Sequence, residues 1–304
     1  MAFSVKRFWD EAWNLYWKAI FGFLAVTGLW GKFWRPFYLF LAFLYKNGVA
    51  PIKFMNYGYV PLTPEDEAAL QPVETEISEE NEEERTHIQL YERVLSLCPD
   101  YPQLRELRLL EISCGHGGGI EWIEKTHPAI KQIRGMDMTI VDTLGGKIFQ
   151  GDATRNPLAD QSMDLIINIE SSHCYGDQPA YFAHCYRILR PGGFLLWADF
   201  RPIGYRTDLC FSDPVDAGFE LVEKVDITEN VLRSLDKQHC RHKRMFERKW
   251  YTRVLSIVWN AFWGVPGTAI YRDLSNGRFK YQAACWQKPA DEQIRHVRRP
   301  SGSN

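Results

Sequence analysis

The chain has 304 residues, of which 45 % are apolar and 24 % are charged, and its formal net charge is −2. This length is enough for one well-buried core, or for a core with an appendage, and the composition is that of a globular protein. A charge so close to zero argues against nucleic acid as a partner, because neutralising phosphates needs a clear basic excess. The seven cysteines form no CxxC pair and are odd in number, which predicts a reducing compartment and not a disulfide framework.

The first fifty residues are rich in Trp, Phe and Tyr and contain two apolar runs, at residues 19–31 and 36–45. Each run is shorter than the about 20 apolar residues that a membrane span needs, and cations separate them. Aromatic rings with flanking cations favour the headgroup boundary, so we expect an apolar helical segment that contacts a membrane surface. Two alternatives stay open. These helices could only pack over the acceptor pocket, or residues 12–31 could form a true span.

Uneven charge along the chain predicts the boundaries of its parts. Residues 74–84 are almost solidly acidic and are interpreted as a solvated stretch. We therefore expect an apolar aromatic-rich segment (1–50), a linker (51–84), a main domain (85–288) with its core at 85–200 and an acceptor lid and C-terminal strands at 201–288, and a flexible tail (289–304).

An apolar run at residues 107–113 leads directly into a glycine-rich turn, Cys114-Gly115-His116-Gly117-Gly118-Gly119, and a helical pattern follows at residues 120–126. In a strand, glycine turn and helix of this kind, the backbone passes close to a ligand and the helix N-terminus offers free N–H groups. Several classes of nucleotide-binding fold share such a turn, so the turn alone is weak evidence.

Acidic residues follow the next two predicted strands. Residues 132–136 form a strand that ends at Asp137, whose carboxylate can accept hydrogen bonds from two ribose hydroxyls. Residues 148–150 form a third strand, after which Asp152 is a candidate contact for the exocyclic amine of adenine. Either acid could instead cap a turn, but their joint order after the glycine turn predicts a nucleotide-binding domain.

Residues 162–170 form an apolar fourth strand that ends in Ser171-Ser172-His173-Cys174-Tyr175. A helix at residues 179–189, a turn at 190–193 and a fifth strand at 194–198 follow. Strands that alternate with helices are typical of an α/β fold with helices on both faces of the sheet.

These segments resemble the class I methyltransferases that depend on S-adenosylmethionine (SAM), in the motifs EISCGHGGG (111–119), GMD (135–137), GDA (151–153), MDLIINIESSHCY (163–175) and LRPGGFLLWADFRP (189–202). The motifs SCGHGGG and ESSHCY, with the stretches at 84–94 and 264–288, look like the mycobacterial phthiotriolone and phenolphthiotriolone dimycocerosate methyltransferases. The resemblance covers about residues 52–288. The connection between Asp137 and Asp152 is short where that family usually holds a full helix.

The resemblance implies a Rossmann-like class I methyltransferase sheet, SAM as cofactor, and O-methylation of a hydroxyl on a long-chain lipid. The stretch Asn56-Tyr57-Gly58-Tyr59 resembles an NxGY element that covers the cofactor in related methyltransferases. The predicted cofactor-binding residues are Tyr57, Glu111, Ser113, Gly115, His116, Gly117, Asp137, Met138, Asp152, Ala153 and Glu170.

A hydroxyl acceptor becomes a good nucleophile once a base takes its proton, and a neutral imidazole has a suitable pKa. His173, at the end of the fourth strand, is therefore the candidate base, and Tyr175 is a candidate to orient the acceptor. Alternatively, His173 only binds backbone and the transfer works by proximity. No metal site is predicted, because residues 236–244 bring two His and one Cys together without further ligands at suitable spacing.

The expected partners are a hydrophobic small-molecule acceptor and a membrane surface, without nucleic acid, and the expected location is intracellular, peripheral on a membrane that faces the cytoplasm. Two alternative functions remain: C- or N-methylation of a sterol, prenyl-quinone or amine, and a catalytically silent membrane-associated adaptor. A nicotinamide oxidoreductase is disfavoured, because the turn lacks GxGxxG.

Overall fold

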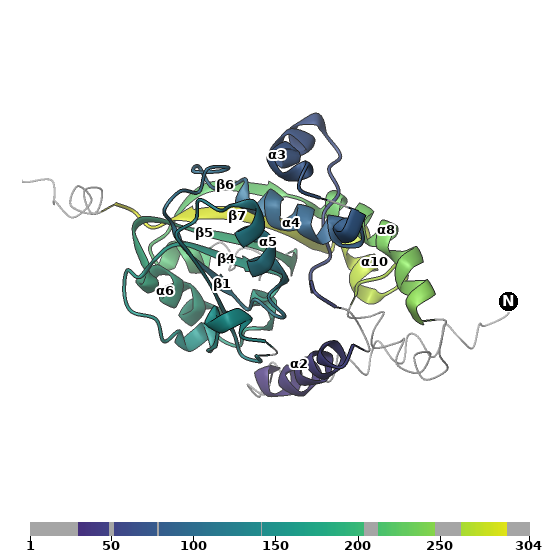
Figure 1. Cartoon of the computed structure of the whole chain (residues 1–304), viewed down its shortest axis with the longest axis horizontal. Helices are drawn as coiled ribbons and strands as arrows, with labels where there is room; N and C mark the ends of the chain where they lie inside the picture. Colours follow the sequence, from purple (N-terminus) through teal and green to yellow (C-terminus); the bar gives the residue numbers. More distant parts are fainter. Residues whose placement is uncertain are drawn as a thin grey trace, which may run out of the picture.

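The structure, a computed structural model, describes residues 30–48, 52–77, 79–140, 142–203, 212–246 and 263–290. Its centre is a seven-stranded sheet in the order β3-β2-β1-β4-β5-β7-β6 (Figure 1). The pairs from β3 to β5 are parallel, whereas β7 runs antiparallel to both of its neighbours. The predicted Rossmann-like methyltransferase sheet is thus confirmed, as a mixed sheet.

The strands are β1 (Arg108–Ile112), β2 (Gln132–Asp137), β3 (Ile148–Gln150), β4 (Met163–Ile169), β5 (Leu189–Pro202), β6 (Glu220–Asp226) and β7 (Phe279–Gln287). The first four lie where the sequence predicts them. β5 begins earlier, because Leu189 pairs with β4 and the N–H of Gly192 donates to the carbonyl oxygen of Lys288 at 2.8 Å. The turn predicted at residues 190–193 is therefore wrong: these residues belong to the strand.

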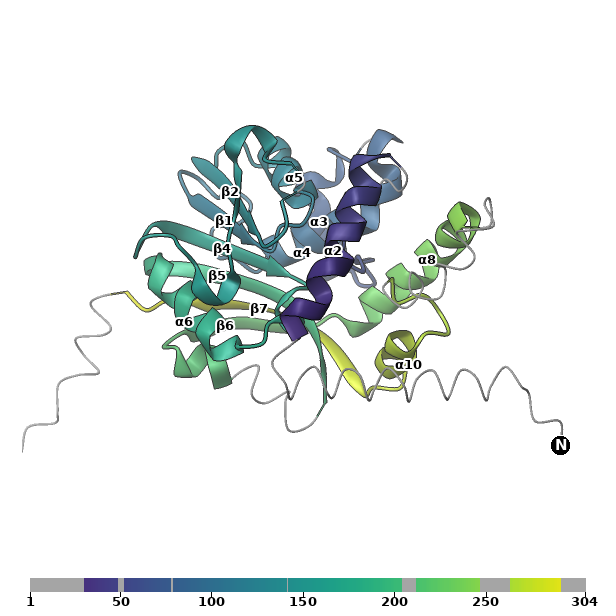
Figure 2. The same cartoon turned by 90° about the horizontal axis from the view of Figure 1, so that it is seen from below.

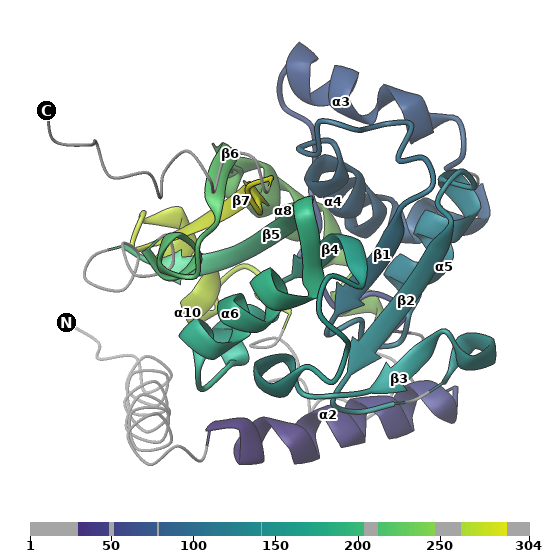
Figure 3. The ribbon, with the colours of Figure 1, turned by 90° about the vertical axis from the view of Figure 1, so that its left-hand side faces the viewer.

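Different helices cover the two faces of the sheet (Figure 3). Leu109 and Leu110 of β1 point to opposite faces, as alternation along a strand requires. Leu109 shares a cluster with α4, α5, α8 and α10, and Leu110 shares one with α6. The helices are α2 (Trp30–Lys46), α3 (Pro64–Glu74), α4 (Arg85–Leu95), α5 (Gly118–Thr126), α6 (Gln178–Ile188), α8 (Thr228–Phe246) and α10 (Ala269–Ser275), with short 3-10 turns η1 (Glu79–Glu84), η2 (Leu144–Gly146), η3 (Ala153–Arg155) and η4 (Ser172–Cys174).

The part of the chain interpreted as a linker contains helix α3. Thr63 caps this helix, since its side chain accepts the backbone N–H of Asp66 and the Asp66 side chain accepts the N–H of Thr63. Leu70 and Val73 of α3 are buried in the larger core cluster. Residues 51–84 therefore include a packed helix that the acidic composition did not reveal.

Helix α2 crosses the carboxyl ends of the parallel strands (Figure 2). Its Leu41 is fully buried in a small apolar cluster with Ile52, Trp263 and Val265. No helix in the described ranges combines the length and hydropathy of a bilayer span. Residues 1–29 and 49–50 of the predicted N-terminal segment lie outside the described residues, as do residues 204–211 and 247–262 of the predicted lid region and residues 291–304 of the tail.

A buried carboxylate joins helices α4 and α5. Glu92 is fully buried; its carboxylate accepts the indole N–H of Trp122 at 2.6 Å and the hydroxyl of Tyr101 at 3.2 Å. The ring nitrogen Nε2 of His127 lies 3.1 Å from the same group. A buried polar group is tolerated when it is hydrogen-bonded in this way, so the cluster fixes the two helices to each other.

Glu92→Ala should lower the free energy of unfolding by about 3 kcal/mol, because it leaves buried donors without an acceptor. Chemical denaturation followed by circular dichroism measures this loss. Glu76→Ala, at an exposed position after α3, is the control and should change stability by no more than about 0.5 kcal/mol. Equal unfolding midpoints for the two variants would contradict the stabilising role of the cluster.

Candidate functional site

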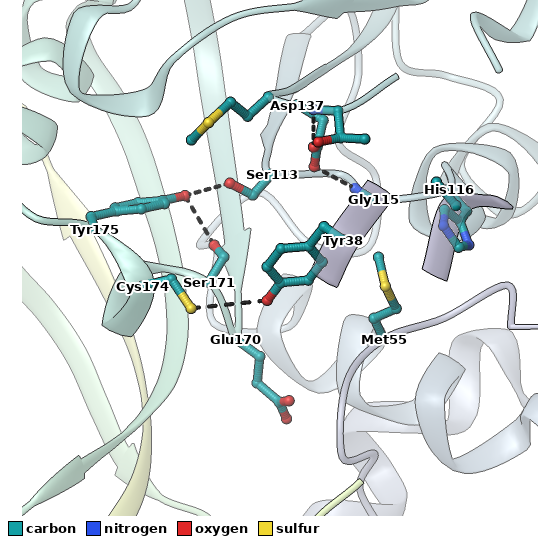
Figure 4. A pocket seen from close by; sticks show the side chains of 13 residues that line it. Tyr38, Met55, Ser113, Gly115, His116, Asp137, Glu170, Ser171, Cys174 and Tyr175 are labelled. Atoms are coloured by element: carbon teal, nitrogen blue, oxygen red, sulfur yellow. Dashed lines mark hydrogen bonds between the residues drawn. The ribbon is translucent and has the colours of Figure 1, made fainter. Parts of the chain in front are cut away.

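A pocket lies at the carboxyl ends of β1, β2 and β4, under helix α2 (Figure 4). It encloses about 840 Å³, its open mouth included, which suits a small molecule. Ligands of open α/β sheets bind outside the carboxyl ends of the strands, so this is the expected place for a site. The lining residues are Tyr38, Ala42, Met55, Ser113, Gly115, His116, Asp137, Met138, Thr139, Glu170, Ser171, Cys174 and Tyr175.

The glycine turn after β1 forms one wall of the pocket. Gly115 and Gly117 have φ angles of +55° and +84°, a region that favours glycine. At Gly118, an added Cβ would lie 2.8 Å from the carbonyl oxygen of Lys53, so a side chain there would meet backbone. The turn therefore needs its glycines, and it leads directly into the N-terminus of α5.

The carboxylate of Asp137 joins the end of β2 to this turn. It accepts the N–H of Gly115 at 2.9 Å and the N–H of Thr139 at 2.8 Å. Burial raises the pKa of Asp137 to about 6, although these N–H groups act in the opposite direction. Near pH 7 the group is mainly a carboxylate that lines the pocket and has further acceptor capacity, as ribose recognition requires.

Glu111 lies beneath the pocket at the end of β1. It is buried, and its Oε1 accepts the hydroxyl of Tyr91 at 2.5 Å. Its Oε2 has no hydrogen-bond partner among the described residues. Burial raises the pKa of Glu111 to about 8, against the lowering effect of Tyr91, and Asp137 raises it further. Such an unpaired buried oxygen is costly, and a bound ligand that forms a hydrogen bond with it would relieve this cost.

His116 connects the glycine turn to the N-terminal segments. Its Nδ1 lies 2.6 Å from the carbonyl oxygen of Ile52, and its ring stacks on Tyr45 of α2 with centroids 4.4 Å apart. Burial lowers the pKa of His116. The residue therefore orders the turn and its cover.

Tyr175 closes the β4 side of the pocket. Its hydroxyl oxygen lies 2.6 Å from the Oγ of Ser113 and 3.0 Å from the Oγ of Ser171, and it accepts from the side-chain amide of Asn168 at 3.0 Å. These contacts tie the ends of β1 and β4 together. The predicted role of Tyr175 in orienting the acceptor stays a prediction, and its hydroxyl is already engaged with the protein.

His173 is held by a buried acid. Its Nδ1 lies 2.8 Å from Oδ1 of Asp199, and its backbone N–H donates to Oδ2 of Asp199 at 2.9 Å. On the other side, the guanidinium of Arg201 lies 2.8 Å from Oδ2. Burial lowers the pKa of His173, but Cys174 and Asp199 raise it more, to about 10. The neutral imidazole that the predicted base role requires is therefore the minor form near pH 7.

Glu170 follows β4 and faces the pocket near His173. Its Oε1 accepts the backbone N–H of Tyr57 and the hydroxyl of Tyr281, each at 2.7 Å. Burial raises the pKa of Glu170 to about 8, while Tyr281 and Tyr57 act to lower it. The ring of Tyr57 stacks on Phe200, and Phe200 in turn contacts His173 with ring centroids 4.5 Å apart.

The structure brings some predicted residues to the pocket and leaves others outside its lining. Ser113, Gly115, His116, Asp137, Met138, Glu170 and Tyr175 line it. Asp152 instead caps η3, since its Oδ1 accepts the N–H of Thr154 at 2.8 Å. The other predicted residues outside the lining are Tyr57, Glu111, Gly117, Ala153 and His173.

Six lining residues were not selected from the sequence. Thr139, Ser171 and Cys174 are next to, or close to, selected positions, and the rule that sites follow strand ends would have included them. Tyr38 and Ala42 lie on α2, and Met55 lies in the segment after it. The apolar composition of α2 does not distinguish a pocket cover from a membrane-facing helix.

The comparisons with known proteins agree with this geometry. A family model described as "Methyltransferase domain" matches residues 110–197. The chain is 30 % identical over 282 residues to the phthiotriol/phenolphthiotriol dimycocerosates methyltransferase of Mycobacterium leprae, which covers 88 % of this chain and 98 % of that one. It is 29 % identical over 252 residues to the fatty-acid O-methyltransferase of Mycolicibacterium smegmatis, which covers 79 % and 85 % of the two chains.

A solved structure also shares the fold. The geranyl diphosphate C-methyltransferase of Streptomyces coelicolor A3(2) superposes with a TM-score of 0.53 at 15 % sequence identity, over 83 % of this chain and 98 % of that one. At this identity the likeness concerns the fold alone.

The residues present fit SAM. Asp137 offers acceptors for the ribose, the glycine turn admits close approach of the ligand, and the buried Glu111 carboxyl has one oxygen without a partner among the described residues. In the described part of the chain, no cluster of His, Cys, Asp and Glu has the form of a metal site.

Asp137→Ala should weaken SAM binding by about 1–3 kcal/mol, because the ribose hydroxyls lose their acceptor. Isothermal titration calorimetry measures the affinity, and circular dichroism checks that the variant is folded. Asp152→Ala is the comparison, and its loss should be smaller, because Asp152 is outside the pocket lining. Unchanged affinity in a folded Asp137→Ala protein would contradict the ribose assignment.

Proposed function

Because the chain belongs to the family of SAM-dependent methyltransferases that includes the phthiotriol/phenolphthiotriol dimycocerosates methyltransferases, we propose that it O-methylates a hydroxyl group on a lipid or another hydrophobic small molecule. The enzyme class and the cofactor, SAM, follow from the family. The names of two relatives support the finer proposal, since one acts on phthiotriol dimycocerosates and the other on fatty acids at oxygen.

The observation that carries the proposal is the position of α2, which has apolar residues on both faces. Tyr38 and Ala42 line the pocket on the inner face. Leu39, Phe40 and Phe43 are 50 %, 40 % and 60 % exposed on the outer face. An apolar acceptor can thus reach the pocket along a helix that is apolar on both sides, which a polar acceptor would not require.

The pocket has two ends with different chemistry. Asp137 and the glycine turn form one end of the pocket, Glu170 lies at the other, and Tyr38 lies between them (Figure 4). SAM supplies an activated methyl group on a sulfonium, so the protein has to align the acceptor and accept its proton. The strand-end residues hold the cofactor end in place, while α2 excludes water from the acceptor end.

We also propose that the outer face of α2 contacts a lipid surface, with the enzyme inside the cell and peripheral on a membrane that faces the cytoplasm. Leu39, Phe40 and Phe43 are spaced so that they share one side of the helix. Lys46, at the end of the same helix, is exposed and carries the charge that anionic headgroups attract. This arrangement would take a lipid acceptor from the membrane into the pocket.

Lipid extracts incubated with the protein and methyl-labelled SAM should yield a labelled methyl ether or methyl ester, identified by mass spectrometry. A hydroxyl acceptor gives an ether. A label on carbon or nitrogen would overturn O-methylation in favour of a sterol, quinone or amine acceptor. A protein that binds SAM yet labels no extract would support the silent adaptor instead.

Replacing Leu39, Phe40 and Phe43 together by Gln should reduce binding to anionic liposomes at least tenfold, while SAM affinity changes little, because these side chains point away from the pocket. Flotation measures liposome binding, and calorimetry measures SAM affinity. Leu221→Gln with Val222→Gln, at two comparably exposed positions on β6, is the matched control and should float like the wild type. Equal flotation of the triple variant and the control would contradict the proposed contact.

A further inference from the structure

We propose that Glu170 is the group that takes the hydroxyl proton of the acceptor, and that His173 stays positively charged beside it. This inference rests on the proposed O-methylation of a hydroxyl and assigns its proton transfer. It differs from the expectations that His173 is the base and that Glu170 binds the cofactor.

The position of Glu170 suits the acceptor end of the pocket. Asp137 is the last residue of β2 and Glu170 follows β4, and β1 lies between these strands in the sheet. Two strand spacings separate them by roughly 10 Å. A cofactor whose ribose is held at Asp137 therefore extends toward Glu170, and Figure 4 shows the Glu170 carboxylate directed away from Asp137 and Gly115.

The two hydrogen bonds to Glu170 hold one oxygen of its carboxylate, and neither of them occupies the other oxygen. Both the N–H of Tyr57 and the hydroxyl of Tyr281 donate to Oε1. The side chain of Glu170 is partly exposed and lines the pocket. One oxygen is thus anchored by the protein while the other is available for a proton from a ligand.

His173 has a fixed partner instead. Its Nδ1 is bound to Asp199, and it is outside the pocket lining. Asp199 lies between Arg201 and His173, so these three groups together carry a net positive charge when His173 is protonated. Burial, the largest effect, and Asp199 raise the pKa of Glu170, whereas Tyr281, Tyr57 and the charged His173 lower it, and together they bring it to about 8.

The groups that act on Glu170 come from every element packed against it. They are Tyr57 before α3, Tyr91 on α4, His173 on η4, Asp199 on β5 and Tyr281 on β7. Burial raises the pKa of each of these tyrosines, so near pH 7 they are neutral donors or spectators. Glu170 is the pocket-lining group among them whose pKa lies close to neutrality, where a general base is most effective.

The step balances. A lone pair of the acceptor oxygen forms the new O–CH₃ bond, the C–S bond breaks and its electron pair stays on sulfur as a neutral thioether, and the hydroxyl proton goes to Oε2 of Glu170. The carboxyl then returns the proton to water when the product leaves.

The rate against pH tests the assignment. A base must be deprotonated, so the wild-type rate should rise with pH through a midpoint near 8. Glu170→Gln should lower the rate about 10²–10⁴-fold and remove this rise, with SAM affinity nearly unchanged. Tyr281→Phe should keep the rise but move its midpoint up by about one pH unit, because one donor to the carboxylate is lost. His173→Gln should also move the midpoint up, since it removes a neighbouring positive charge.

Tyr175→Phe is the matched control for Tyr281→Phe. It removes a tyrosine hydroxyl that is bound to Ser113, Ser171 and Asn168 and not to Glu170, so the midpoint should stay at the wild-type value. Glu170→Asp keeps a carboxylate and should keep a rise with pH at a reduced rate, which guards against a general folding defect in Glu170→Gln.

Infrared difference spectra of the protein without ligands give a readout independent of turnover. Glu170→Gln should lose a carboxyl C=O band that titrates near pH 8, and Glu111→Gln should lose a different one, because burial raises both pKa values to about 8. A rise with pH that persists in Glu170→Gln and vanishes in His173→Gln overturns the assignment and restores His173 as the base. A labelled product on carbon or nitrogen overturns the proposed function itself, and with it this step.

Discussion

The hydrogen bond from the N–H of Gly115 to the carboxylate of Asp137 is the contact on which the cofactor end of the pocket depends. It exists because β1 and β2 are parallel and in register, with Ile112 beside Met136, so both strands deliver their ends to one edge. The positive φ of Gly115 then turns its N–H toward the acid. One carboxylate thereby positions the glycine turn and still faces the pocket.

The part of the sheet formed by β4, β5 and β7 holds the buried ionisable groups of the site. β7 runs antiparallel to β5 and brings Tyr281 to Glu170, while β5 carries Asp199, which holds His173. Burial is what makes these groups interact strongly, because a low dielectric weakens the screening between them. The pKa values of Glu170 and His173 therefore move in ways that neither residue type would show in water.

Helix α2 lies between the pocket and the surface of the protein. Its inner face carries Tyr38, whose hydroxyl lies 3.9 Å from the Sγ of Cys174, and Tyr45, which stacks on His116. Its outer face exposes apolar side chains that a protein in water gains nothing by exposing. A helix with these two faces covers the pocket, and under the proposed function it would offer an apolar acceptor a path to it.

The sequence by itself determined the glycine turn, Asp137 and the first four strands, because these follow from local patterns: apolar runs, glycines, and acids at strand ends. It also placed Glu170 and His173 at the end of β4. It misplaced the start of β5, since a Pro-Gly-Gly stretch that is typical of a turn is held in the strand by distant β7. Only the tertiary structure decided which groups meet. Asp199 lies 26 residues from His173, and Tyr281 lies 111 residues from Glu170. Protonation depends on such neighbours and on burial, which no local pattern encodes, so the chemistry of the pocket was settled by the packing of the sheet.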